Sequence, residues 1–171
     1  MAASWAEPFA LADEEWPSSG VLTAREAVTK RGPLQTTRGA PGEVIVRTTI
    51  PIRWLEPVAR DLNRMLSLPE GWDSYGANVV RSEAAAAVIK LLARIGNDVK
   101  APSLHPTPAG GILMEWNTPL GGLEIEVERE DRICLLAEES GAGVVIEEEG
   151  VGFTRFLIDF LPKVSHLIPR A

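Results

Sequence analysis

The sequence predicts an α+β domain, in which two to three helices pack on an antiparallel meander sheet of four or five strands. Two segments with helical apolar spacing come first, followed by four short β-rich runs separated by turn residues. An aromatic segment with helical spacing ends the chain. Helices that precede and follow a run of neighbouring strands are typical of α+β architecture.

The bulk composition limits the class of protein. The 171 residues fit one domain with a tail, and 45% hydrophobic and 24% charged residues are typical of soluble globular proteins. The net charge of −7 argues against a general nucleic-acid binder and suits a basic protein partner.

The single cysteine, Cys134, excludes an intramolecular disulfide and a cysteine zinc site, and favours a reducing cytoplasm. The first residues do not resemble a signal peptide, and no apolar run reaches the roughly 18 residues of a membrane span. The motifs of phosphate-binding loops, zinc proteases and serine hydrolases do not occur. We expect no cofactor and no metal.

Residues 1–42 are predicted to be a flexible N-terminal tail, and residues 43–171 a single α+β domain. Prolines and glycines interrupt the tail throughout. Trp5, Phe9 and Trp16 lie among acidic residues, which is typical of a segment that orders when it docks on a partner. The alternative is that these rings fold back onto their own domain.

Three helices and one strand are predicted before the meander. The run TAREAVTKRG (23–32) is a candidate short helix, and EVIVRTTI (43–50) reads as a strand. A helix over 53–68 requires Pro57 in its first turn. The clearest helix covers 82–96, with Ser82 as N-cap and Gly96 just past its end.

The link LPEGWDSYGANVV (68–80) is the most distinctive stretch of the chain. Gly76 and its neighbours supply turns, and we expect Trp72 and Tyr75 to be buried caps over the adjoining helices. Asp73 is predicted to stabilise a turn; the alternative is a catalytic acid or metal ligand. His105 follows in APSLHPTPAGG (101–111), predicted to be a stiff surface connector, and no partner residue can be assigned to it.

The predicted strands are 112–117, 122–130, 132–138 and 143–149. Leu123, Ile125 and Val127 alternate with Glu124, Glu126 and Glu128, so one face is predicted to enter the core and the other to face water. A hairpin loop at TPLG would place Glu115 beside Glu124, and like charges facing each other across strands are destabilising.

Several groups are candidates to offset this repulsion: Arg47, Arg129, Arg132, a divalent cation or a basic partner. A regular strand is a poor chelating loop, so a metal is disfavoured. A solvated glutamate face is the first expectation, and an acidic docking surface at Glu115, Glu124, Glu126 and Glu128 is the second.

The C-terminal segment, 152–171, is predicted to be a helix that bends at Pro162. Phe153, Phe156 and Phe160 share one face of it. We expect this face to cover the sheet, because a sheet must bury its apolar face. The alternative is that the aromatic face enters a groove of a partner.

The chain resembles a small bacterial and phage-borne domain with the pattern LP-x-x-WD-x-YGA, a helix, and P-T-P-x-GG-I-x-x-EW. The resemblance covers about residues 62–138 and rests on these matching positions: Trp72, Asp73, Tyr75, Gly76, Ala77, Pro106, Thr107, Pro108, Gly110, Gly111, Glu115 and Trp116. It implies a fold and a structural role for the first motif, and no established activity.

Two functions follow. The first is a non-enzymatic interaction module, namely an inhibitor, antitoxin-like protein or accessory subunit that binds a larger, basic protein partner, with homo-oligomerisation open. The alternative is a small hydrolase-like or ligand-binding enzyme that uses Asp73 and His105. The enzyme requires these two side chains to converge in a pocket.

Overall fold

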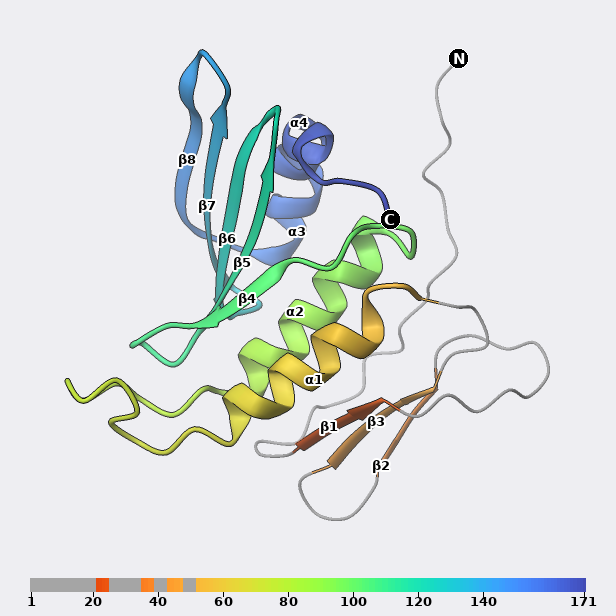
Figure 1. Cartoon of the computed structure of the whole chain (residues 1–171), viewed down its shortest axis with the longest axis vertical. Coiled ribbons are helices and arrows are strands. Elements are labelled where there is room, and N and C mark those ends of the chain that lie inside the picture. The colour runs from red at the N-terminus through yellow and green to blue at the C-terminus, as the bar shows by residue number, and fades with distance from the viewer. Residues whose placement is uncertain (1–20, 25–34, 39–42, 48–51) are drawn as a thin grey trace.

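A computed structural model describes residues 21–24, 35–38, 43–47 and 52–171, with side chains from residue 52 onward (Figure 1). Its centre is a five-stranded antiparallel sheet in which neighbours in sequence are neighbours in space. The strands are β4 (Ser103–Pro106), β5 (Ile112–Thr118), β6 (Gly121–Arg129), β7 (Arg132–Glu139) and β8 (Gly143–Val151). The predicted α+β meander with helices packed on it is confirmed.

Two helices precede the sheet: α1 (Leu55–Leu66) and α2 (Ser82–Ile95). Pro57 lies in the first turn of α1, where its missing N–H is not needed. Ser82 is the first helical residue of α2, so Arg81 and not Ser82 occupies the N-cap position. The Ser82 hydroxyl makes a hydrogen bond with the Glu83 carboxylate instead of a backbone N–H.

The C-terminal segment is helical but irregular: α3 (Phe153–Arg155), the π-helix η1 (Phe156–Phe160), α4 (Leu161–Val164) and the 3₁₀ turn η2 (Ser165–Leu167). Leu161 N–H bonds the Phe156 carbonyl, five residues back, which widens the turn before Pro162. Proline has no N–H and its ring crowds the carbonyl four residues earlier, so the helix departs from α geometry here.

The helices all lie on one face of the sheet, and the opposite face carries no described element (Figure 1). The core between sheet and helices includes Leu62 of α1, Leu91 of α2, Ile125 of β6 and Phe156 of η1. The expected inward alternation is confirmed, since Leu123, Ile125, Val127, Ile112, Met114 and Trp116 are all buried.

The proline-rich stretch 101–111 differs from its prediction as a surface connector. It forms β4, which pairs antiparallel with β5 and buries Leu104 opposite Met114. Pro106 is tolerated because β4 is an edge strand, where one row of backbone groups needs no partner within the sheet. His105 consequently lies on a strand and not in a loop.

The predicted tail also contains strands. β1 (Val21–Ala24) and β2 (Gln35–Arg38) flank β3 (Glu43–Arg47) in a second sheet, in the order β1-β3-β2, and β1 lies against α1. β3 confirms the strand predicted at 43–50, whereas β1 replaces the start of the helix predicted at 23–32. Trp5, Phe9 and Trp16 lie outside the described residues.

Candidate protein-interaction surface

Cross-strand register aligns side chains in rows over the uncovered face of the sheet, called here the open face. One row crosses all five strands: Ser103, Glu115, Glu124, Leu136 and Glu147. The adjacent row contains His105, Leu113, Glu126 and Cys134. These residues alternate with buried ones, so they share the face turned away from the helices.

Glu115 lies directly opposite Glu124, which confirms the register expected from the TPLG turn. Glu115 Oε2 lies 2.7 Å from His105 Nε2. At the other end of β6, Glu128 pairs with Arg132 at 3.4 Å and Arg81 at 3.9 Å.

Between these paired ends, Glu124 and Glu126 form no ion pair with any residue of 52–171. Arg132, one of the candidate partners for these glutamates, forms its described ion pair with Glu128. Arg129 instead binds Asp131 at 2.6 Å, and the Arg47 side chain lies outside the described part. Two neighbouring carboxylates on β6 therefore face solvent without a described counter-charge.

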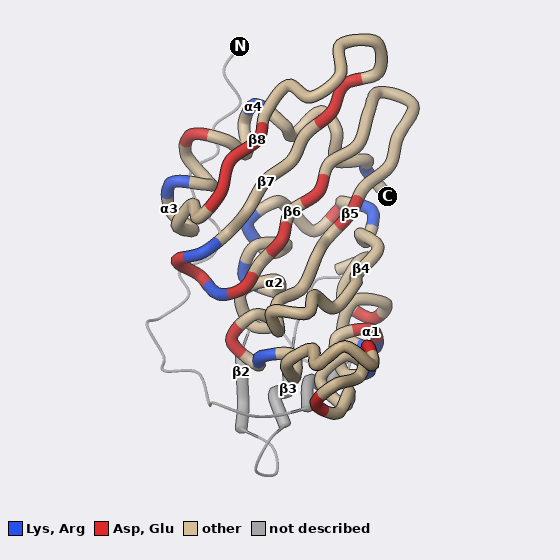
Figure 2. The backbone as a smooth tube through the Cα atoms, turned by 90° about the vertical axis from the view of Figure 1, so that its left-hand side faces the viewer, with Lys and Arg blue, Asp and Glu red and all other residues tan. Residues whose placement is uncertain are grey.

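Charge is strongly segregated between the two layers. Residues 112–151, which form β5 to β8, contain eleven Asp and Glu and two Arg, a net charge of −9. The remainder of 52–171 contains seven acidic and ten basic residues, a net charge of +3. Figure 2 views the open face and shows the acidic segments running along these strands.

Apolar groups lie between the glutamates. Leu113, Cys134 and Leu136 are half-buried on the open face, and Val144 near the start of β8 is exposed. No described element covers these groups on this side of the sheet (Figure 1). The open face is thus a mixed acidic and apolar surface and not a uniformly solvated one.

The loop after α1 is organised by Asp73. Its Oδ1 accepts the backbone N–H groups of Tyr75 at 2.8 Å and Ala77 at 3.0 Å. These bonds favour the ionised form and lower the pKa of Asp73 below its ordinary value. The Gly71 N–H closes the loop on the Ala77 carbonyl at 2.8 Å. Asp73 therefore has the turn-stabilising position expected from the sequence.

Tyr75 does not have the buried position expected for it. Its side chain is 94% exposed, and Ser74 before it adopts a positive φ of 68°. Trp72 is half-buried and donates its indole N–H to the Asn78 carbonyl at 3.2 Å. The described hydrogen bonds that hold the loop come from its backbone, Asp73 and Trp72. None of them involves the Tyr75 side chain.

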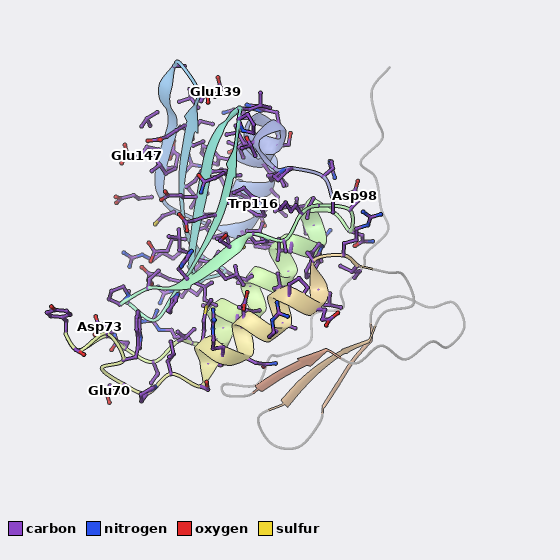
Figure 3. The ribbon with its side chains drawn as sticks, viewed as in Figure 1. Glu70, Asp73, Asp98, Trp116, Glu139 and Glu147 are labelled. Carbon is purple, nitrogen blue, oxygen red and sulfur yellow. The ribbon has the colours of Figure 1, made fainter. Side chains whose placement is uncertain are left out.

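This loop docks on the turn between β4 and β5. Asn78 N–H donates to the Pro108 carbonyl and Arg81 N–H to the Gly110 carbonyl, both at 3.0 Å. Gly110 has φ of 84°, and a Cβ there would lie 2.6 Å from the Val79 carbonyl oxygen. Figure 3 shows Asp73 and Glu147 on the same side of the molecule, so the loop extends toward the open face.

The structure does not join the two residues of the enzyme alternative. Asp73 is engaged by its own loop and His105 by Glu115, and no hydrogen bond or ion pair connects them within residues 52–171. Across the described residues, no group of three or more His, Cys, Asp and Glu has a metal-binding arrangement.

The aromatic C-terminal face covers the sheet. Phe156 is fully buried and Phe160 is 5% exposed, both within the core, while Phe153 is half-buried against it. These rings already have the sheet and helices of their own chain as partners. In this conformation they do not offer the partner-binding surface that was the alternative for this segment.

The His105–Glu115 pair is the feature of the site that sequence reasoning missed. Ten residues separate these side chains, and the antiparallel pairing of β4 with β5 brings them together. The available signal was the pattern Ser103, Leu104, His105, in which an apolar residue lies between two polar ones. The surrounding prolines favoured the prediction of an unpaired connector over that of a strand.

Comparisons with known proteins add no relative: no protein-family model, curated protein or solved structure matches the chain. None of the helices in the described part has the length and apolar character needed to cross a membrane.

Proposed function

We propose that the chain is a non-enzymatic interaction module that binds a larger, basic protein partner through the open face. It would serve as an inhibitor, an antitoxin-like protein or an accessory subunit. The observation that carries the proposal is the pair Glu124 and Glu126, which have no ion-pair partner in residues 52–171 on a face that no described element covers. The single cysteine supports a cytoplasmic location.

The cross-strand pair Glu115 and Glu124 explains why a cation would be favoured there. Two carboxylates in this position repel each other in the free protein. A lysine or arginine placed between them replaces that repulsion with attraction. Complementary charge also speeds association and selects among partners.

Leu113 and Leu136 supply the apolar component of the surface. They lie beside Glu126 and Glu124 in the cross-strand register, so aliphatic stems of basic side chains can cover them while the charged ends reach the carboxylates. The proposed contact therefore combines burial of apolar area with charge pairing.

The enzyme alternative, a small hydrolase-like or ligand-binding protein, lacks a supporting contact. It requires Asp73 and His105 to act on one substrate, and each of these side chains is held by a different partner. The contacts of Asp73 and His105 therefore favour the interaction module over the enzyme.

The test is affinity capture from the native host with the full chain as bait and mass spectrometry to identify the bound proteins. Glu124→Gln/Glu126→Gln removes the unpaired charges, and Glu56→Gln/Glu83→Gln removes two charges from the helical layer as a matched control. We expect a partner with a basic surface to be lost with the first variant and retained with the second.

A further full-length variant, Trp5→Ala/Phe9→Ala/Trp16→Ala, tests the N-terminal aromatic residues without removing β1 and β2. Loss of the partner there alone would assign binding to the N-terminal segment and overturn the assignment to the open face. Equal capture by all variants, or capture of acidic proteins only, would also overturn it.

A further inference from the structure

Tyr75 is a large aromatic residue of the 68–80 loop whose side chain has no described structural role. Asp73 bonds two N–H groups, Trp72 bonds the Asn78 carbonyl, and Ala77 is buried. The Tyr75 ring and hydroxyl make no contact of this kind with residues 52–171, and the side chain is 94% exposed. A large aromatic side chain in such a position is a candidate anchor for a partner.

The loop presents this ring in a defined conformation. Five hydrogen bonds within the loop and two to the β4–β5 turn fix its backbone around the tip. Ser74 has a positive φ, a conformation that L residues other than glycine, asparagine and aspartate adopt infrequently. A preorganised loop loses less conformational entropy on binding than a free one.

The ring is also connected to the open face. Arg81 directly follows the loop, and its guanidinium approaches Glu128 on β6. The loop itself projects to the side that bears Glu147 (Figure 3). Glu70 and Asp73 add two carboxylates within the loop, and Glu70 is exposed. A basic segment that lies on the open face would therefore reach the Tyr75 ring, which has these two carboxylates in the same loop.

We propose that Tyr75 binds an arginine side chain of the same basic segment that occupies the open face, with the guanidinium stacked on the phenol ring. This inference rests on the proposed function and specifies its partner chemistry. Arginine is favoured over lysine because its planar guanidinium stacks on aromatic rings and is less strongly hydrated than an ammonium group.

A second copy of this chain is a poor occupant of the same surface. Pairing two open faces would bring Glu115, Glu124, Glu126 and Glu147 of each copy together. Residues 112–151 contain only two arginines to offset this repulsion. Charge complementarity therefore favours a different, cationic chain.

The test measures binding of fluorescein-labelled nona-arginine and nona-lysine peptides to the full chain by fluorescence anisotropy at fixed salt. Both peptides carry the same charge, so a preference for nona-arginine reports the side-chain chemistry. We expect nona-arginine to bind about 2- to 5-fold more tightly, Tyr75→Ala to abolish that preference, and Tyr75→Phe to keep it because the ring remains.

The substitutions at Tyr75 change no charge, which separates this inference from the proposed function. If Glu124→Gln/Glu126→Gln weakens both peptides while Tyr75→Ala leaves the preference unchanged, the role of Tyr75 is overturned and the open face stands. If the glutamate variant binds both peptides as well as the Glu56→Gln/Glu83→Gln control does, or if neither peptide binds, the basic-partner proposal itself is overturned.

Discussion

Glu115 and Glu124 face each other across β5 and β6 on the open face, and of the two only Glu115 has a described side-chain partner, the imidazole of His105. A sheet selected for stability alone would place an opposite charge or a neutral residue at one of these positions. The repulsion between Glu115 and Glu124 is consistent with a surface that receives its positive charge from another molecule.

Removing this repulsion should stabilise the isolated protein. We expect Glu124→Gln to raise the free energy of unfolding by about 0.2–1 kcal/mol, measured by urea denaturation at low salt. Glu126→Gln is the matched control, because Glu126 lies opposite Leu113 and Cys134 and not opposite a carboxylate. The difference should shrink as salt is added. An equal gain in both variants would contradict this explanation.

Asp73 should control the order of the 68–80 loop. Asp73→Ala removes the acceptor of the Tyr75 and Ala77 N–H groups, so we expect those two amides to exchange with deuterium about five-fold faster or more. Amides of β6 should be unaffected. Asp73→Asn, which keeps one side-chain oxygen, should give an intermediate rate, and unchanged exchange in Asp73→Ala would exclude the capping role.

The same hydrogen bonds predict a pH dependence. Because they lower the pKa of Asp73 in the folded state, its ionised carboxylate stabilises the loop above the pKa of the unfolded chain. This contribution is lost as the pH falls through the lower, folded pKa. NMR titration of the Tyr75 and Ala77 amide shifts should give a midpoint below the ordinary aspartate range; a midpoint within or above that range would refute the assignment.

Gly110 should be required by the contact between the two loops. Gly110 and Gly141 have nearly the same positive φ, 84° and 89°, but a Cβ at Gly110 would meet the Val79 carbonyl oxygen and one at Gly141 would meet nothing within 4 Å. Gly141→Ala therefore reports the backbone cost alone, about 1–2 kcal/mol. We expect Gly110→Ala to lower the melting temperature further, and equal losses would show that the loops separate easily.

The C-terminal segment should be part of the core. Phe156 is fully buried, so Phe156→Ala should cost about 3–5 kcal/mol of unfolding free energy. Ile158, two residues later on the same π-helix, is 67% exposed, and Ile158→Ala should stay within about 0.5 kcal/mol. A small effect of Phe156→Ala would mean that the segment separates readily from the sheet.

The sequence was sufficient for the elements with strong periodicity. The alternation of Leu123, Ile125 and Val127 with glutamates identifies the buried face of β6, and the short TPLG turn leaves one register, which pairs Glu115 with Glu124. The glutamates that alternate with these buried residues lie on the opposite side of the sheet, which is the open face.

Features that depend on hydrogen bonds and strand pairing, and not on an apolar period, were harder to predict. β4 lies among prolines, and its pairing with β5 outweighs the local preference for an extended, unpaired chain. The exposure of Tyr75 follows from backbone hydrogen bonds within the loop, and side-chain hydrophobicity alone pointed to burial. β1 and β2 are only four residues each, too short to show a period among the surrounding glycines and prolines.

The segregation of charge between the sheet and the helices has a consequence for diffusion. With −9 on one layer and +3 on the remainder of 52–171, the described domain behaves as an electric dipole. The field of an approaching polycation exerts a torque on such a body within about a Debye length, roughly 8 Å at physiological ionic strength. The open face is then turned toward the polycation before the two molecules make contact, so a larger share of collisions occurs in the binding orientation.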